Sequence, residues 1–262
     1  MKKLLVMIIV LFTTSCSVQN YYQIFKASTE NGELTTGAIV FEDENCKVVY
    51  DLWDNGGNVG FAIFNKSKKD IVIDLTHTFF VINGITYDYF LDRTFSNSSS
   101  TGTSEATSQQ RKVYEQLIYP YYRNIGTDSK GNSKSSSTSV SRSFNEKTHR
   151  TVLPGTSIFV SEYNITSGRY SNCELTIYPS RKQTKTLTFS KSNSPFVFKN
   201  VISYETGGIV SKMENKFYVS EITDQPEKGL FKLVTKSACG NQLSKPIRVF
   251  KESPPDKFYF KY

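Results

Sequence analysis

Short segments rich in β-branched and aromatic residues follow one another closely between residues 38 and 75. Turn-forming residues separate these segments, as at 54–58, which reads Asp-Asn-Gly-Gly-Asn. No segment in this part of the chain keeps the 3.6-residue apolar period of an amphipathic helix, which argues against crossover helices and a parallel sheet. The pattern therefore predicts a mainly β fold, an antiparallel sandwich.

The clearest turn signal is Asn83-Gly84, with an apolar run at 79–82 before it and Ile-Thr-Tyr at 85–87 after it. Asn-Gly supplies the positive φ angles that a two-residue hairpin turn needs. Gly207-Gly208 is a second candidate of the same kind. We expect a β-hairpin at each place.

The first sixteen residues have the pattern of a secretion signal. Lys2 and Lys3 precede an apolar run at 4–12, and small residues lead to Cys16. The run is much shorter than the roughly 20 residues of a transmembrane helix. A cysteine after small residues resembles the lipobox of bacterial lipoproteins, which implies removal of 1–15 and attachment of a fatty-acylated diacylglycerol to Cys16.

The other three cysteines would then lie in an oxidising compartment, where one disulfide and one spare thiol is the simple expectation. Cys46 sits in an alternating strand pattern and should be a small buried hydrophobe. Cys173 and Cys239 lie beside turn-forming residues, which favours a bridge between them, although all three pairings stay open. Their spacing does not match a zinc site, so no metal is expected.

A long insertion is predicted at 95–149, because it contains two Ser/Thr-rich stretches too polar to offset the entropy of ordering. Between them, 111–123 has apolar residues at helical spacing until Pro120. This element either packs on the edge of the sandwich or presents an aromatic and basic surface to a partner. The partner-binding candidates are Tyr119, Tyr121, Tyr122 and Arg123.

The whole chain divides into four predicted parts. The signal at 1–15 precedes an N-terminal tether at 16–36, part of which alternates enough to join a sheet. A β-sandwich at 37–166 carries the mobile insertion, and a C-terminal β region at 167–262 packs on the sandwich or continues it. Within the last region, 226–234 has the partial apolar stripe of a brief helix, and the aromatic C-terminal residues should be docked.

Residues that suggest catalysis are scarce. His77 and His149 stand alone in the sequence, without a metal-binding or catalytic motif around them. No catalytic residue and no cofactor is therefore predicted. The net charge of +8 comes from dispersed lysines rather than a basic stripe, which argues against a nucleic-acid partner.

The segment 59–75 together with the hairpin after it resembles the strand-turn-strand pattern of immunoglobulin-like domains in secreted bacterial proteins. With the lipobox, the chain resembles uncharacterised lipoproteins of Gram-negative gut bacteria. This resemblance implies an immunoglobulin-like sandwich and an outer-membrane location, and no activity. Residues 17–20 contain no acid of the kind that marks surface export, which favours the periplasmic face over the cell surface.

Two functional classes follow from these observations. The first is a lipid-anchored, non-enzymatic binding or structural module whose partner is the membrane and an envelope protein or glycan. The alternative is an envelope hydrolase acting on glycan or peptide, which would require converging carboxylates, or a nucleophile beside a histidine.

Overall fold

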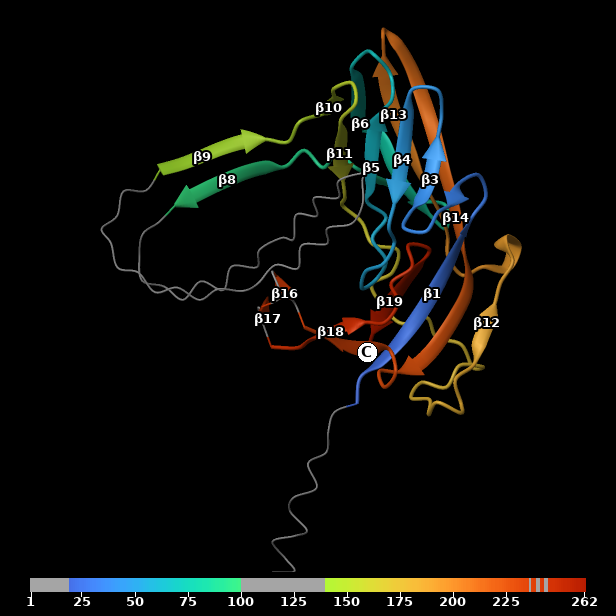
Figure 1. Cartoon of the computed structure of the whole chain (residues 1–262). Helices are drawn as coiled ribbons and strands as arrows, with labels where there is room; N and C mark the ends of the chain where they lie inside the picture. The colour runs from blue at the N-terminus through green and yellow to red at the C-terminus, as the bar shows by residue number, and fades with distance from the viewer. Residues whose placement is uncertain (1–18, 100–139, 236, 239–240, 243–244) are drawn as a thin grey trace, which may run out of the picture.

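The computed structural model describes residues 19–99, 140–235, 237–238, 241–242 and 245–262. Within these ranges the chain is mainly β, as predicted, and its one helical element is a short 3-10 turn, η1 (Lys191–Asn193). Two antiparallel sheets form the body, and their buried faces pack together (Figure 1).

The larger sheet has eight strands in the order β10-β6-β13-β14-β1-β19, with β12 paired to β14 and β7 paired to β6. These strands are β1 (Tyr21–Thr29), β6 (Ile71–Ile82), β7 (Ile85–Asp88), β10 (His149–Val152), β12 (Thr186–Thr188), β13 (Val197–Thr206), β14 (Ile209–Pro226) and β19 (Lys257–Lys261). The order joins the N-terminal strand to strands from the predicted C-terminal region, so that region continues the sandwich. The predicted docking of the C-terminal residues is confirmed, because β19 pairs with β1.

The smaller sheet has five strands in the order β11-β5-β4-β3-β2. They are β2 (Glu33–Leu34), β3 (Ile39–Glu42), β4 (Cys46–Tyr50), β5 (Phe61–Asn65) and β11 (Ser157–Val160). In β4 buried and half-buried residues alternate, which is the period of a strand with one face on the core.

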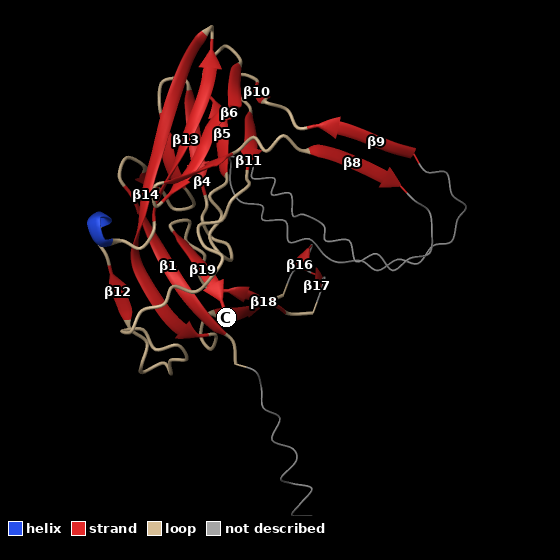
Figure 2. Cartoon of the chain, turned by 180° about the vertical axis from the view of Figure 1, so that it is seen from behind, coloured by secondary structure: helices blue, strands red, loops and turns tan. Residues whose placement is uncertain are grey.

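Three further ladders have two strands each. They pair β15 (Phe231–Val234) with β18 (Ile247–Phe250), β16 (Ser237–Ala238) with β17 (Asn241–Gln242), and β8 (Thr94–Ser99) with β9 (Val140–Asn145). The ladder of β8 and β9 extends away from the two sheets, as opposite views show (Figures 1 and 2).

Both predicted hairpins are confirmed. Asn83 and Gly84 have φ angles of 50° and 84° and join β6 to β7. Gly207 and Gly208 have φ angles of 59° and 84° and join β13 to β14. Positive φ at both central residues is the requirement of a tight turn between right-twisted strands.

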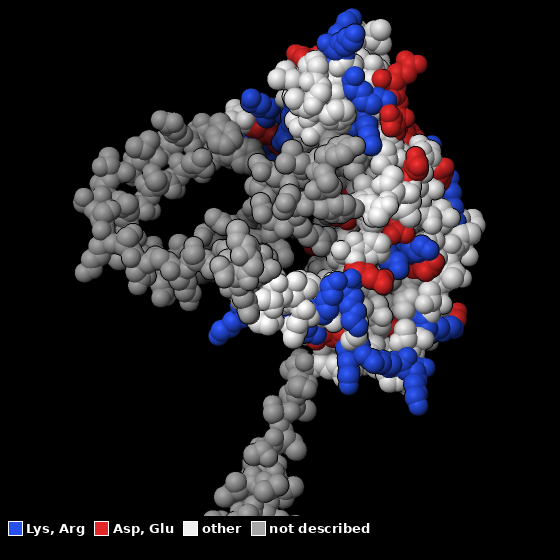
Figure 3. Space-filling view, in the orientation of Figure 1, with Lys and Arg blue, Asp and Glu red and all other residues white. Residues whose placement is uncertain are grey.

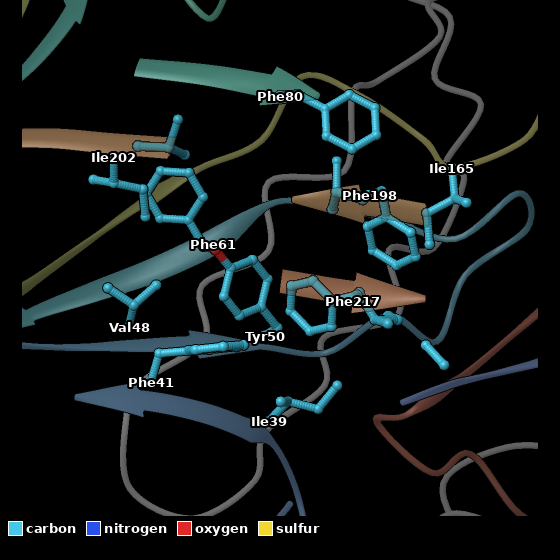
Figure 4. Close-up of a cluster of buried hydrophobic side chains, with 14 of the residues drawn as sticks. Ile39, Phe41, Val48, Tyr50, Phe61, Phe80, Ile165, Phe198, Ile202 and Phe217 are labelled. Carbon is cyan, nitrogen blue, oxygen red and sulfur yellow. The ribbon is translucent and has the colours of Figure 1, made fainter. Parts of the chain in front are cut away.

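The core lies between the two sheets and is rich in aromatic rings (Figure 4). The ring of Phe217, from the larger sheet, lies 5.1 Å from both Phe41 and Tyr50 of the smaller sheet. Phe198 stacks on the same ring at 5.0 Å. Burial of these side chains is the main force that holds the sheets together.

Two predicted boundaries differ from the structure. The predicted tether at 16–36 contributes β2 and the whole of β1, because β1 alternates well enough to pair with β14 on one side and β19 on the other. The predicted insertion at 95–149 overlaps the β8–β9 ladder and β10. Its central part, 100–139, lies outside the described residues.

The brief helix predicted at 226–234 is wrong. Pro226 ends β14, Gly229 turns the chain with a φ of 106°, and β15 begins at Phe231. The apolar spacing fitted a helix as well as a strand. The outcome depends on a partner distant in sequence, since Phe231 packs on Phe250 with ring centroids 4.2 Å apart.

Candidate functional site

A hollow of about 370 Å³ opens between the β6–β7 hairpin and the loop that follows β11. Its volume lies within the range of small-ligand pockets. Its lining residues are Phe80, Ile82, Tyr87, Tyr163, Asn164, Ile165, Thr166 and Ser167.

Three aromatic rings form one wall of this hollow. The hairpin register sets Phe80 opposite Tyr87, so both side chains project from the same face of the sheet. The ring of Tyr163 stacks on Phe80 at 5.6 Å with a 20° interplanar angle and lies 5.6 Å from Tyr87. Phe80 is buried, whereas Tyr87 is 40% exposed.

Two contacts hold the side chain of Tyr163 in place. Its hydroxyl donates to the backbone carbonyl of Asp88, and the ring of Tyr89 meets it edge-on at 5.4 Å. Burial raises the pKa of Tyr163, and the carboxylates of Glu162 and Asp88 raise it further. The hydroxyl therefore stays protonated at neutral pH and keeps donating to the carbonyl.

Three polar residues of the loop after β11 also line the hollow. The loop that carries Asn164, Thr166 and Ser167 is fixed by backbone hydrogen bonds, including Thr166 N to Gly56 O at 2.9 Å. Gly56 has a φ of 85°, and a Cβ there would lie 2.5 Å from the carbonyl oxygen of Thr166. The Gly-Gly turn at 56–57 is therefore required for the loop that carries Thr166 to pack against it.

The base of the β8–β9 ladder adjoins the aromatic wall. The Arg93 guanidinium donates to Glu146 Oε1 at 2.6 Å and to Glu162 Oε1 at 2.7 Å, and Glu162 directly precedes Tyr163. Burial favours a higher pKa for Glu146, but hydrogen bonds from Arg93 and from the Leu91 backbone outweigh it and lower that pKa. The strands that lead to 100–139 thus leave the body next to the hollow.

The predicted site residues have separate outcomes. The lipidation candidate Cys16, the disulfide candidate Cys239 and the partner-binding candidates Tyr119, Tyr121, Tyr122 and Arg123 lie outside the described residues. Cys173 is exposed, and its bridge to Cys239 stays a prediction. Cys46 is fully buried, as predicted, and burial raises the pKa of its thiol to about 12, which leaves it unreactive.

The structure brings together two histidines that are far apart in sequence. His149 pairs with Asp74 across β10 and β6, which places its Nε2 4.0 Å from Asp74 Oδ1. The Nδ1 atom of His77 lies 2.7 Å from Asp74 Oδ2. Burial favours a higher pKa for Asp74, but hydrogen bonds from Thr76 and His77 outweigh it and lower that pKa. Both imidazoles are largely exposed, so this cluster lies on the surface.

Among the described residues, no group of three or more His, Cys, Asp or Glu side chains has the arrangement of a metal site. No helix within the same ranges has the length and apolar character of a membrane span. The chain matches no protein-family model, no curated protein and no solved structure.

The sequence patterns did not predict this hollow. The hairpin alone predicts that Phe80 and Tyr87 lie side by side on one face of the sheet. The position of the loop at 163–167, however, depends on the pairing of β11 with β5. The only local signal for that approach is the Gly-Gly pair at 56–57, which we interpreted as a simple turn.

Proposed function

We propose that this chain is a lipid-anchored cell-envelope protein whose sandwich binds a glycan in the hollow beside the β6–β7 hairpin. The observation that carries this proposal is that the aromatic rings of Phe80, Tyr87 and Tyr163 line the same hollow as the polar side chains of the loop after β11. The proposal includes an immunoglobulin-like topology for the sandwich and a position on the periplasmic face of the outer membrane. The packed antiparallel sheets support the first part, and the signal-like residues 1–16 support the second.

The chemistry of the hollow suits a sugar ring. The exposed face of Tyr87 can cover the apolar C–H face of a pyranose, and a preformed ring loses little conformational entropy on contact. Asn164 and Ser167 supply an amide and a hydroxyl group for the sugar hydroxyls, and Thr166 Oγ1, which already donates to Gly168 O at 2.8 Å, can accept one more hydrogen bond. The site therefore has both an apolar wall and hydrogen-bonding groups, as small-molecule sites generally have.

The hydrolase alternative receives less support from this site. Within the described lining there is no carboxylate, thiol or imidazole that could transfer a proton or attack a bond. Cleavage of a glycoside needs two carboxyl groups on either side of the bond. The hollow therefore favours binding without chemistry.

Replacing Tyr87 with alanine should weaken glycan binding about tenfold, because it removes the exposed stacking face. The chain would be applied to an array of bacterial-envelope and plant-type oligosaccharides, and the affinity for the best binder measured by calorimetry. Tyr178→Ala is the matched control, since Tyr178 is another exposed tyrosine, 65% accessible and outside the hollow. Equal losses for both variants, or an array without a binder, would exclude the hollow as a glycan site.

The lipid anchor is tested separately. Cells expressing the full chain and fed a labelled fatty acid should incorporate the label into the protein, and Cys16→Ala should abolish this incorporation. Cys173→Ala is the control, because Cys173 is an exposed cysteine remote from the lipobox. Label that persists in Cys16→Ala at the level of the control would reject the anchor.

A further inference from the structure

Three tyrosine rings meet where the chain enters the larger sheet. The backbone N–H of Tyr21, the first residue of β1, donates to the carbonyl of Tyr262 at 3.0 Å. The ring of Tyr21 lies 5.1 Å from Tyr178 and 6.0 Å from Tyr262. The hydroxyl of Tyr262 donates to the carbonyl of Ile177 at 2.6 Å, which fixes the loop beside this end.

Basic residues cluster around these tyrosines. Arg181 donates to the carbonyl of Lys228 at 2.9 Å, so the two residues are neighbours. Lys228 follows Glu227, whose N–H donates to Asn20 at the entrance to β1. Lys261 is in register with Tyr22 on the adjacent strand. Figure 3 shows Lys and Arg gathered at the lower end of the described surface, where β1 begins.

We call this end the entry face and define it by Ile177, Tyr178, Arg181, Lys228 and Lys261. All five residues are exposed, and Ile177 and Tyr178 are 50% and 65% accessible. It thus combines positive charge with an aliphatic and an amphipathic aromatic side chain.

The neighbouring acid does not neutralise this face. Glu227 is half-buried and accepts from Arg248 at 2.8 Å and from Asn20 at 3.0 Å. Its charge is therefore matched by Arg248, and the charges of Arg181, Lys228 and Lys261 remain in excess.

The distance to the proposed lipid anchor is short. Five residue steps separate Cys16 from Tyr21, and a fully extended chain spans at most about 18 Å over that length. Under the proposed function, an acyl group on Cys16 would hold the entry face within this distance of the bilayer. A surface so close to the headgroups meets a negative potential in any membrane that contains anionic lipid.

We propose that the entry face docks on an anionic phospholipid bilayer, with the three basic side chains against the headgroup phosphates and Ile177 and Tyr178 at the interface. Tyrosine is enriched at this depth because its ring is apolar and its hydroxyl stays hydrated. The docking orients the sandwich with the entry face toward the membrane and the 207–208 turn, at the other end of β14, away from it.

The test uses the full chain carrying Cys16→Ala, so that no acyl chain contributes to binding. Its affinity is measured by cosedimentation with vesicles of phosphatidylcholine alone and of phosphatidylcholine with phosphatidylglycerol. We expect a preference for the anionic vesicles that weakens as salt is raised. The substitutions Arg181→Ala, Lys228→Ala and Lys261→Ala together should lower that preference roughly 100-fold, at about fivefold for each basic residue.

The matched control removes the same charge from the opposite end of β14. Lys68, Lys69 and Lys212 are exposed, and Lys69 lies against Gly207 in the distal turn. Their replacement by alanine should leave the anionic preference almost unchanged, and thermal melts should show all variants folded. Equal binding of the parent chain to both vesicle types, or an equal loss in the control variant, overturns the proposal.

This result is independent of the anchor. Every chain in the vesicle assay lacks Cys16, and residues 1–15 contribute equally to each of them. Failure of fatty-acid labelling would reject the anchor without changing the vesicle result, and failure of the vesicle assay would reject the docking face without affecting the anchor.

Discussion

Replacing Phe258 with alanine should lower the free energy of unfolding by about 3–5 kcal/mol. Phe258 is fully buried in β19 and stacks on Phe25 of β1, with ring centroids 4.6 Å apart and a 3° interplanar angle. Gly57 packs directly against the same ring. Truncation of Phe258 would leave a cavity where β1, β19 and the turn at 56–57 meet.

Urea denaturation of the purified chain measures this loss. Tyr259→Ala is not a suitable control, because that ring also packs on Trp53 and Phe250. Leu233→Ala is better, since Leu233 is 71% exposed and its replacement should cost less than about 0.5 kcal/mol. A Phe258→Ala loss no larger than that of Leu233→Ala would show that β19 is not part of the core.

Replacing Asn200 with leucine should lower the free energy of unfolding by about 3 kcal/mol, although leucine has the same branched shape. Asn200 is buried, and its amide nitrogen donates to Val59 O at 2.9 Å and to Tyr50 Oη at 3.2 Å. Its side-chain oxygen accepts from Tyr89 Oη at 3.0 Å. The substitution removes all three hydrogen bonds at once, and each buried polar group that is left without a partner lowers the stability.

Asn215→Leu is the matched control for this network. Asn215 is equally buried and donates to Tyr50 Oη at 2.7 Å, but its side-chain oxygen has no hydrogen-bond partner. Losing one hydrogen bond and removing an unpaired oxygen should cost clearly less than the Asn200 change. A larger loss for Asn215→Leu in the same denaturation series would contradict this assignment of the network.

Burial raises the pKa of both Tyr50 and Tyr89. Their hydroxyls stay protonated across the neutral range, so the network does not lose its tyrosine donors as the pH rises moderately. Each asparagine variant should therefore lose as much free energy of unfolding at pH 6 as it loses at pH 8, about the range in which most proteins are stable.

Local signals predicted the strands, the two hairpins and the docked C-terminal residues. Asn83-Gly84 and Gly207-Gly208 carry their turn geometry in their own residues, because few other pairs adopt positive φ so readily. Alternation alone predicted that Cys46 would be buried, and it is.

Features that depend on distant pairing could not be predicted in the same way. The approach of His149 to Asp74 depends on β10 pairing with β6 across 75 positions of sequence, a register that no local pattern specifies. The hollow likewise combines the β6–β7 hairpin with a loop positioned by β5 and β11. The burial of Asn200 likewise depends on partners distant in sequence, the Tyr50 and Tyr89 hydroxyls and the Val59 carbonyl.

A crystal structure of the chain with the tightest-binding oligosaccharide of the array tests the glycan proposal most directly. We predict that one sugar ring lies against Tyr87 and Tyr163, with sugar hydroxyls at about 3 Å from the polar groups of Asn164, Thr166 or Ser167. An oligosaccharide bound elsewhere on the sandwich, with the hollow empty, would contradict the proposal.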